Sequence, residues 1–600
     1  MDTNAFYGAN TFENDRCNGF PTKFVNFNSR KNKGKKLKYK GRKIMKLIRK
    51  ILLICLCFSS IFAISCGGGN QGGGNSEPPK VDPTCTVTPV AYDQVNTRKD
   101  MDAFLEENRD DLKKDYGFVK GIWHKLTVGG KNVEVYSARC GKNVHSFAWV
   151  DIDTKAPDGE FNLDVSLKIL DNSKETVTVL PEKLGVETQF ADSTATCTLH
   201  KYGSYSFVFN EDPDKALTLY VAPLSTLKIP AGYNKVDIEP GTYERKDTTF
   251  AEENTVYNFK SGVYDITSIS VPSNSILYFE RGVYIRVYEA FDGDYFATLI
   301  LNNTKNTKIL GRAIFDYSKC LGGESKTKGA YSINRANNVE VEGIITINSH
   351  NWTMCADYSK NIKITRCMFF SYRTFSDGIM LSDCQDSTAT DNFVRTGDDA
   401  IEVKSFAKID AEDCYTKNIV YENNCVWTDK GIAYGLIYEA IHNAGDVYFR
   451  NNSVGFAQAA WSEHLGCCTM QMGSNKNSTW SNIHFEDIEV YSASCALLSV
   501  YNRAVNANEG GTIKNIYFKN VTLKYARKTQ RDVYCLSVVM RKGKDVPVSN
   551  CKISGLYLDN INFAGVAITA DNIDDYKNVA LDDGFKFLKS AVKVNTNPSV

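Results

Sequence analysis

The sequence has almost no net charge and lacks the cysteine spacing of a zinc site. Its 71 lysines and arginines are matched by 70 aspartates and glutamates among 600 residues. Proteins that bind nucleic acid carry a basic excess that neutralises phosphates, so this balance gives no indication of a nucleic-acid partner. The 18 cysteines include no Cys-x-x-Cys pair, and Cys467 and Cys468 are adjacent. Neither arrangement suits a structural zinc site, and we expect neither a metal nor another cofactor.

The most apolar stretch near the N-terminus is short. Ile51–Ile64 has the length of a signal peptide and is too short to cross a bilayer as a stable helix. A basic segment that starts at Met45 precedes it, and a stretch of small residues that ends at Cys66 follows it. This order resembles a bacterial lipoprotein signal, with Ala63 in place of the usual leucine. We therefore expect residues 45–66 to be a lipoprotein signal peptide and Cys66 to carry the lipid.

The segments on either side of this signal are polar. Residues 1–44 become increasingly basic and cannot form a core, so we interpret them as a disordered lead or a misassigned start. Residues 67–95 begin with a glycine-rich run, which predicts a flexible tether. We expect an exported lipoprotein of the cell envelope or cell surface, held to the membrane by its lipid. An ordinary cleaved signal peptide would instead give a secreted protein without the anchor.

Residues 96–225 carry a helical pattern followed by strand patterns. Apolar residues spaced among charges at 96–116 predict an amphipathic helix. From Gly121 on, apolar and polar residues alternate in short segments, and these include 133–136, 161–165, 205–209 and 216–221. Alternation with a period of two is typical of half-buried strands. These segments predict a β-sandwich domain.

Residues 226–565 repeat one short unit, in which a polar turn residue precedes alternating apolar residues. The units begin at Asn338, Asn361, Asn418, Asp446, Asn482 and Asn515. Their spacing is irregular because loops of different length interrupt the repeat, whereas a β-propeller has longer and more even repeats. The pattern predicts an all-β protein, a right-handed parallel β-helix preceded by the β-sandwich. The tail, residues 566–600, is polar and helix-like, and we expect it to cap the β-helix.

Two short motifs of the repeat array, one coil apart, carry three aspartates between them. Asp377 comes first, and Asp398 follows it after an interval that matches the repeat, with Asp399 directly behind. An interval of this length is one coil of a parallel β-helix, and stacked strands lie about 4.8 Å apart. Residues one coil apart share a face, so we expect Asp377 to lie beside the other two aspartates.

Three adjacent carboxyl groups have chemical consequences. Like charges a few ångström apart raise the pKa of one group, which then keeps its proton near neutral pH. A protonated acid beside an ionised base is the pair that cleavage of a glycosidic bond requires. Asp and Gly are also common turn formers, but the spacing of one coil inside a repeat array favours a catalytic site. The predicted partner is a polysaccharide substrate.

These motifs resemble those of known glycosidases. Asp-Gly-Ile at 377–379, followed by Thr-Gly-Asp-Asp-x-Ile at 396–401, is similar to the core of glycoside hydrolase family 28, the polygalacturonases. The plan also resembles family 49, the dextranases and isopullulanases, which carry a sandwich before the β-helix. The resemblance extends weakly over residues 227–563. It implies an inverting glycosidase in which Asp398 protonates the leaving oxygen while Asp377 and Asp399 activate water.

Two further polygalacturonase motifs have no full counterpart. Their Gly-His-Gly is matched most nearly by Ala433-Tyr434-Gly435, with tyrosine in place of histidine. Their Arg-x-Lys is matched most nearly by residues 469–472, which hold no basic residue. The groups that the resemblance would assign to carboxylate support and uronate binding are therefore missing. A site without basic groups binds a uronate poorly, so a neutral glycan fits better.

Aromatic and basic residues around the three aspartates are candidates for contacts with sugar. Aromatic rings can stack on sugar rings, although each such residue is more often part of a core. Basic side chains near the aspartate pair would serve an acidic sugar if they are not ordinary surface charges. The predicted substrate-binding residues are Trp352, Tyr372, Arg373, Arg395, Lys404, Tyr434, Trp461 and His464.

Two other classes of protein remain open. A polysaccharide lyase shares this fold, but it would need a calcium cluster and a lysine or arginine base. A non-catalytic glycan-binding surface protein on the same fold would agree with the missing histidine and basic pair, but not with the three aspartates. Activity in excess chelator distinguishes a hydrolase from a lyase. Loss of cleavage without loss of binding in Asp398→Asn distinguishes an enzyme from a binding protein.

Overall fold

The part of the chain that the structure describes folds mainly as β-strands. The computed structural model describes residues 85–93, 118–121, 123–140, 143–154, 161–171, 173–288, 297–318, 320, 329–349, 351–405, 415–458, 464–475, 477–504, 506, 509–529, 532–587 and 589–595. The expected signal peptide with Cys66 and the helix expected at 96–116 lie outside these ranges. Within them, no helix has the length and hydrophobicity that crossing a membrane requires.

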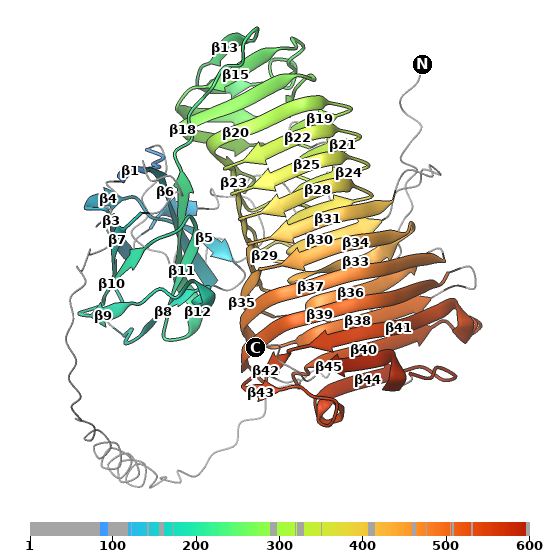
Figure 1. The fold of residues 1–600 in the computed structure, drawn as a ribbon. Helices are drawn as coiled ribbons and strands as arrows, with labels where there is room; N and C mark the ends of the chain where they lie inside the picture. The colour runs from blue at the N-terminus through green and yellow to red at the C-terminus, as the bar shows by residue number, and fades with distance from the viewer. Residues whose placement is uncertain are drawn as a thin grey trace, which may run out of the picture. The chain divides into compact units, whose positions relative to one another are not determined.

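The N-terminal domain is a β-sandwich of two sheets, as predicted (Figure 1). The first sheet runs β2 (Phe118–Lys120), β5 (Tyr136–Cys140), β6 (Asn143–Asp153), β12 (Asp212–Pro223), β11 (Gly203–Phe209) and β8 (Val177–Leu180), with β1 (Thr86–Pro89) paired to β6. The second runs β4 (Lys131–Val133), β3 (His124–Val128), β7 (Leu163–Ile169), β10 (Thr194–Leu199) and β9 (Gln189–Ala191). A short 3₁₀ helix, η1, spans Glu182–Leu184.

Two details of the sandwich differ from the sequence prediction. The tether expected at 67–95 contains a strand, because β1 pairs antiparallel with β6 from Thr86 to Pro89. The strand expected at 133–136 is broken, since β4 ends at Val133 and β5 begins at Tyr136. Both valines in this break, Val133 and Val135, are buried, so the alternation in the sequence reflects burial and not continuous pairing.

The C-terminal domain is a right-handed parallel β-helix, as predicted, and its walls are two long sheets (Figure 1). The first wall, sheet C, consists of β13 (Asn234–Ile238), β14 (Gly241–Tyr243), β15 (Thr255–Phe259), β16 (Gly262–Ile266), β18 (Ser275–Val287), β20 (Lys305–Asp316), β22 (Asn337–Glu342), β23 (Ile345–Ile347), β25 (Lys360–Thr365), β26 (Met368–Phe370), β28 (Gln385–Thr390), β29 (Phe393–Thr396), β31 (Thr416–Glu422), β32 (Cys425–Thr428), β34 (Ala444–Arg450), β35 (Ser453–Ala457), β37 (Ser478–Ala493), β39 (Gly511–Ala526), β41 (Cys551–Asp559), β42 (Asn562–Phe563), β43 (Val566–Ala567) and β45 (Val592–Asn595).

The second wall, sheet D, contributes one strand to each coil. It consists of β17 (Ile269–Ser270), β19 (Leu299–Asn302), β21 (Tyr331–Asn334), β24 (Met354–Asp357), β27 (Ile379–Ser382), β30 (Ile401–Ser405), β33 (Tyr434–Ala440), β36 (Gly466–Asn475), β38 (Ala496–Ala504), β40 (Leu536–Lys542) and β44 (Lys577–Leu581). The tail was expected to be a helix-like cap. Instead β44 and β45 pair in parallel with β40 and β41 and add a last coil, with short 3₁₀ helices η2 (Val548–Asn550), η3 (Ile573–Asp575) and η4 (Lys589–Ala591) nearby.

The polar residue that opens each repeat has a backbone reason. Asn338, Asn361 and Asn418 have φ of 60°, 56° and 54°, which is the left-handed region that asparagine tolerates better than most residues. The Asn338 side chain donates a hydrogen bond to Asn306 on the previous coil at 2.8 Å. A buried row does the same inside, where Asn392 donates to Asn424 at 2.9 Å. These asparagines fix where each coil turns.

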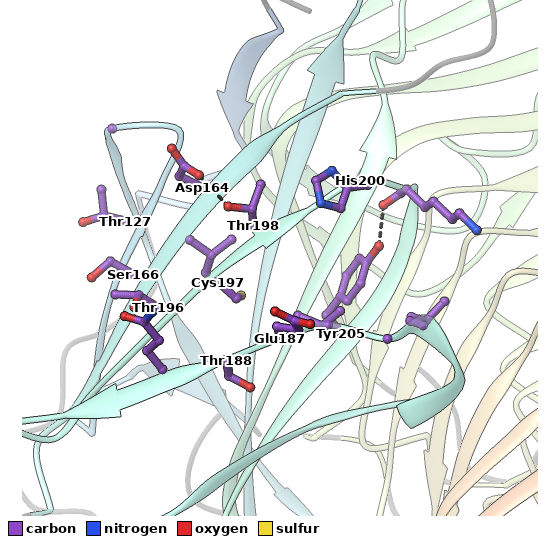
Figure 2. A pocket seen from close by; sticks show the side chains of 17 residues that line it. Thr127, Asp164, Ser166, Glu187, Thr188, Thr196, Cys197, Thr198, His200 and Tyr205 are labelled. Carbon is purple, nitrogen blue, oxygen red and sulfur yellow. Dashed lines mark hydrogen bonds between the residues drawn. The ribbon is translucent and has the colours of Figure 1, made fainter. Parts of the chain in front are cut away.

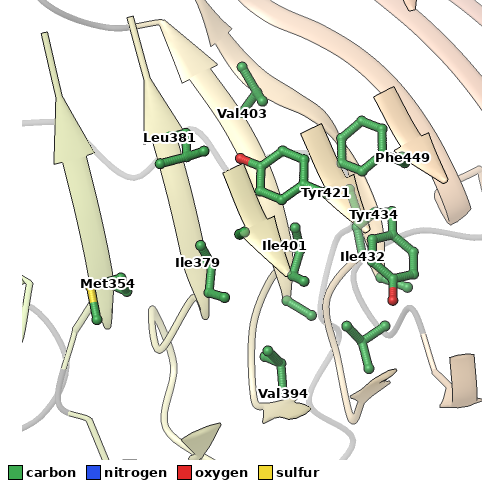
Figure 3. Packing of buried hydrophobic residues seen from close by; sticks show 14 of the residues in the cluster. Met354, Ile379, Leu381, Val394, Ile401, Val403, Tyr421, Ile432, Tyr434 and Phe449 are labelled. Atoms are coloured by element: carbon green, nitrogen blue, oxygen red, sulfur yellow. The ribbon is translucent and has the colours of Figure 1, made fainter. Parts of the chain in front are cut away.

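Alternation along sheet D separates core residues from residues on the outer face. Ile379, Leu381, Ile401 and Val403 point into the apolar core of the β-helix (Figure 3). Because successive side chains in a strand point to opposite faces, the residues between them lie on the outer face of sheet D. The described cysteines are free thiols, and several of them are buried among these core residues, as expected for a small apolar side chain.

The sandwich and the β-helix belong to one compact unit, Val81–Val600, and matched charges join them. Asp151 on β6 is fully buried and accepts hydrogen bonds from the guanidinium groups of Arg312 and Arg281, each at 2.9 Å. Trp149 stacks on Tyr220 beside this pair, with ring centroids 4.2 Å apart. The buried carboxylate is therefore paired with two cations, which is how a charge is tolerated inside a protein.

Candidate active site

The strands β27 and β30 set the position of the three aspartates. Ile379 pairs with Ile401, so one coil leads from the first residue to the second, and the amide of Gly378 donates to the carbonyl of Asp399 at 2.8 Å. The sequence analysis therefore placed Asp377 on the correct coil. It took the interval from Asp377 to Asp398 as the length of the coil, which is one residue too short. Asp377 is aligned with Asp399, and Asp398 lies directly before that position.

Glycines allow the coils to approach at this place. A Cβ atom on Gly378 would lie 2.2 Å from the carbonyl oxygen of Ala400. A Cβ atom on Gly431, one coil further, would lie 2.2 Å from the backbone of Asp398. Real Cβ atoms do not approach so closely, so any larger residue at either position would move the backbone that carries the aspartates.

The structure brings the predicted aspartates together and adds a fourth carboxylate. Oxygens of Asp377, Asp399 and Glu402 lie within 4.8 Å of one another. The carboxylate of Asp398 accepts hydrogen bonds from the amides of Phe375, at 3.0 Å, and Asp399, at 3.1 Å. All four acidic side chains are nearly or fully buried. We call Asp377, Asp398, Asp399 and Glu402 the carboxylate cluster.

Glu402 was missed in the sequence, although a signal was present. Ile401 and Val403 face the core, so Glu402 and Lys404 share the outer face of β30. The ammonium group of Lys404 lies 2.9 Å from Asp377, 3.3 Å from Glu402 and 3.7 Å from Glu439. Lys404, which was predicted to contact the substrate, is thus buried among carboxylates.

The surroundings shift the pKa of three carboxyl groups of the cluster. Burial, followed by the charges of Asp377 and Asp399, raises the pKa of Asp398 well above its usual value. Burial and then Asp377 raise the pKa of Asp399 to about 6. Burial also raises the pKa of Glu402 well above its usual value, against the effect of Lys404. Two aspartates with different proton affinities are what a separate acid and base require.

Burial alone would lower the pKa of Lys404, but the neighbouring carboxylates outweigh it. Asp377, Glu402 and Glu439 raise the pKa of this lysine well above its usual value, so it stays charged. The grouping of Asp377, Asp399 and Glu402 would by distance suit a cation. Lys404 already supplies positive charge to two of these three carboxylates, so the residues present form an ion-paired cluster and not a vacant cage for a metal.

Trp352 and Tyr372 lie close to the cluster. The Lys404 ammonium group is 5.2 Å from the centroid of the Trp352 ring, and Trp352 is half-buried. Tyr372 is also half-buried, and its ring lies 4.4 Å below the guanidinium carbon of Arg139. The backbone of Tyr372 approaches Gly397, immediately before the aspartate pair. Both aromatic residues are partly accessible, and their contact with a sugar remains a prediction.

Three residues that were predicted to contact the substrate are instead buried and bonded within the protein. Two of them are arginines. Arg373 is buried, and its guanidinium group donates to the carbonyls of Ser318 and Cys320 at 3.0 and 2.9 Å. Arg395 is 1% exposed and pairs with Asp429 at 3.1 Å. Neither cation is presented to a substrate.

The third is Tyr434, which is fully buried in the β-helix core (Figure 3), where its hydroxyl group donates to the carbonyls of Asn424 and Ser453. It faces away from the outer surface because it begins the inward row of β33. Trp461 lies outside the described residues. His464 is half-buried, and its Nδ1 lies 3.2 Å from Asn578 on β44.

A separate hollow of about 880 Å³ lies on the sandwich (Figure 2). Its floor is formed by polar residues of β3, β7 and β10, where Thr198 donates to Asp164 at 2.8 Å. At one end the hydroxyl group of Tyr205 donates to the carbonyl of Lys201 at 2.7 Å. None of the residues predicted for the site lines this hollow, so the carboxylate cluster remains the candidate active site.

Comparison with protein families decides the class of this domain. Residues 292–567, which include the whole carboxylate cluster, match the model of Glycosyl hydrolases family 28. This stretch is similar to the family 28 domain. The chain is a glycosidase that acts on polysaccharide, and the family match favours this class over the lyase and over the non-catalytic binding protein. The sequence has no match among curated proteins.

Solved structures resemble this chain at low identity. The family 28 exopolygalacturonase of Yersinia enterocolitica is 11% identical, with a TM-score of 0.41 over 72% of this chain and 96% of its own. The endo-xylogalacturonan hydrolase of Aspergillus tubingensis is 11% identical, with a TM-score of 0.39 over 61% of this chain and 100% of its own. The hyperthermoactive exopolygalacturonase of Thermotoga maritima is 15% identical, with a TM-score of 0.36 over 52% of this chain and 85% of its own. The β-helix of this chain is therefore assigned from its own strand pairing.

Proposed function

We propose that the family 28 domain hydrolyses glycosidic bonds with inversion, and that the carboxylate cluster carries the reaction. Asp398 is the general acid that protonates the leaving oxygen. Asp377 and Asp399 activate the attacking water. The observation that carries this proposal is the grouping of the buried carboxylates, in which two aspartates have their oxygens side by side while the third is held apart by backbone amides.

The two roles follow from the contacts. Asp377 and Asp399 present oxygens within 4.8 Å of each other, which suits two acceptors that orient one water molecule. Burial, and then the charges of Asp377 and Asp399, raise the pKa of Asp398 well above its usual value, which favours its protonated form. Lys404 pairs with Asp377 and places a positive charge beside it.

The residues around the cluster have assigned roles in the same proposal. Trp352 is the candidate for stacking on a sugar ring, since it adjoins Lys404 and is partly accessible. Tyr372, whose backbone approaches Gly397 just before the aspartate pair, is the second candidate for stacking on a sugar ring. His464 lies near Ser499 on the outer face of sheet D, three rungs beyond Glu402, and would meet a longer chain.

The test is a screen for released reducing ends over a panel of neutral and acidic polysaccharides, with the wild type and Asp398→Asn side by side. We expect cleavage of at least one polymer by the wild type, loss in the variant, and a product whose first-formed anomer, seen by proton NMR, has the inverted configuration. No cleavage by the wild type, or cleavage that persists in the variant, would contradict the proposal.

We also propose that the chain is exported and anchored through lipid on Cys66. The proposal rests on the order of basic, apolar and small residues at 45–66, which lie outside the described structure. Mass spectrometry of the membrane fraction should find an acylated Cys66 as the first residue of the mature protein. A mature chain that begins at Met1 would refute it, and a soluble secreted chain would leave the export signal without the anchor.

A further inference from the structure

A buried arginine links the β-sandwich to a loop beside the carboxylate cluster. Arg395 on β29 is 1% exposed, and its guanidinium group donates to both carboxylate oxygens of Asp429, at 3.1 and 3.3 Å. The same group donates to Nδ1 of His145 at 2.8 Å and to the carbonyl of Pro213 at 3.3 Å, and both of these acceptors belong to the sandwich. A guanidinium group has donors only, so the sandwich supplies acceptors that this buried cation needs.

Asp429 begins the segment that holds Asp399. The amide of Ile432, three residues further along the chain, donates to the carboxylate of Asp399 at 2.9 Å. Between the two, a Cβ atom on Gly431 would lie 2.2 Å from the backbone of Asp398. The segment is packed tightly against the aspartate pair, so a displacement of Asp429 would reach the amide that binds Asp399.

His145 on β6 fixes the sandwich side of this contact. Its ring is fully buried, and its Nε2 lies 2.7 Å from the hydroxyl oxygen of Thr218. Because Arg395 can only donate, Nδ1 of His145 accepts, and the neutral ring donates its Nε2 proton to Thr218. Burial, and then the charge of Arg395, lower the pKa of His145 well below its usual value, which agrees with an uncharged ring. Trp427 packs edge-on against this ring, with centroids 4.8 Å apart.

We propose that His145 is a positioning residue for the reaction, and that the sandwich is therefore a working part of the enzyme. Through Arg395 and Asp429 it fixes the loop whose amide binds Asp399. The inference rests on the proposed function, in which Asp399 helps to activate the attacking water. The position of one catalytic carboxylate then depends on a residue that lies about 250 positions earlier in the sequence.

The amide of Ile432 gives this proposal a measurable consequence. Burial and then Asp377 raise the pKa of Asp399 to about 6, whereas Lys404 and the amide of Ile432 lower it. Displacement of the amide should therefore raise this pKa further, and the ionised base should form only at higher pH. The charged or titratable groups around Asp399 are Asp377, Asp398, Glu402, Lys404 and Glu439. Substitutions at His145 leave all of these groups in place and remove no charge.

The experiment measures kcat and the pH dependence of kcat/KM on whichever polymer the wild type cleaves fastest among dextran, pullulan, galactan, arabinan, polygalacturonate and alginate. In His145→Leu, which removes the acceptor, kcat should fall by about 10- to 100-fold, and the acid limb should move up by about one pH unit. His145→Asn offers an amide oxygen near the position of Nδ1 and should restore most of both. Asp151→Asn, at the same domain contact but bonded to Arg281 and Arg312, is the control and should move neither.

Rates are taken per mole of folded protein, from the urea unfolding curve of each variant. A loss in His145→Leu with an unmoved acid limb overturns the role of His145. A loss that His145→Asn shares in full, or the same shift in Asp151→Asn, overturns it too. If His145→Leu does not fold, Thr218→Val, which removes the hydroxyl group that fixes the ring, must move the acid limb in the same direction, and an unmoved limb overturns the role.

The proposed function fails in a different way. Cleavage of no polymer by the wild type, or cleavage that survives Asp398→Asn, overturns the proposed function and this inference with it. Cleavage that Asp398→Asn abolishes, together with an unmoved limb in His145→Leu, overturns the inference alone.

Discussion

Two groups of buried charges in this chain differ in the balance between positive and negative side chains. At the contact between sandwich and β-helix, Asp151 is bonded by two guanidinium groups, from Arg281 and Arg312. In the carboxylate cluster there is one cation for four acidic side chains: Lys404 contacts Asp377 and Glu402, and it also contacts Glu439 outside the cluster. The carboxylates of both groups are buried, so their own exposure to solvent does not explain the difference.

The difference separates a structural role from a catalytic one. Matched charges with complete hydrogen bonds hold two surfaces together and have no proton to exchange. An excess of carboxylates forces some of them to keep protons, which produces an acid and a base in one site. The comparison predicts that changes in the cluster will affect turnover more than stability, and that changes at Asp151 will do the reverse.

The largest expected effect is on turnover. Asp398→Asn should lower kcat by about 10²- to 10⁴-fold, the usual contribution of one general acid or base. The triple change at Asp377, Asp398 and Asp399 should be little worse than the single change, because groups that act as a unit are not additive. Asp386→Asn, at an exposed position on sheet C, is the matched control and should change nothing. Near wild-type turnover in Asp398→Asn would remove the cluster from the reaction.

The next effect is on stability at the domain contact. Asp151→Asn leaves the buried guanidinium group of Arg312 without its counter-charge, so unfolding in urea should become easier by about 3–5 kcal/mol. Turnover measured well below the unfolding midpoint should stay near the wild-type value. An unchanged midpoint would mean that the two domains do not depend on this ion pair.

Within the cluster we expect a smaller effect on stability, and of opposite sign: the substitution should stabilise the protein. The pKa of Asp399 is raised to about 6 in the folded protein, against a usual value of 3.8, so its ionised form destabilises the fold above about pH 6. Asp399→Asn keeps an oxygen for the amide of Ile432 and removes that charge. It should stabilise the protein by about 1–3 kcal/mol at pH 8. The gain should vanish below about pH 4, where Asp399 is protonated in both states. A variant less stable than the wild type at pH 8 would contradict this.

The smallest expected effect is that of a chelator. Lys404 already places a positive charge among the carboxylates, so excess EDTA should leave kcat unchanged within error. The products should show no absorbance from an unsaturated sugar. Loss of activity that calcium restores would instead indicate a lyase-like site.

The sequence predicts the parts of this molecule that depend on periodicity. A polar turn residue followed by alternating apolar residues indicated the β-helix. The pattern recurs because an asparagine with a left-handed backbone conformation is needed once per coil. The spacing of the aspartates placed Asp377 beside the pair, although the pairing of Ile379 with Ile401 aligns it with Asp399 and not with Asp398. An error of a single position in coil length is within what loop variation produces.

The remaining site residues depend on contacts that sequence spacing does not contain. Arg395 looked available for substrate, but its side chain pairs with Asp429 and contacts His145 of the sandwich, which is distant in the sequence. Tyr434 begins an inward row of β33, so its ring fills the core. Glu402 could have been found once Ile401 and Val403 were assigned to the core, because alternation then places it beside Lys404.

The dependence of kcat/KM on pH tests the central claim most directly, since an unbalanced cluster must supply an acid and a base at once. The account predicts a bell-shaped profile. Its acid limb falls below about pH 6, where Asp399 gains a proton, and its alkaline limb falls where Asp398 loses one. Asp377 and Lys404 act on both groups, and Glu439 acts on Asp399. The profile should be the same in Asp151→Asn. A rate that does not change between pH 4 and pH 9 would contradict the claim that this cluster performs acid–base chemistry.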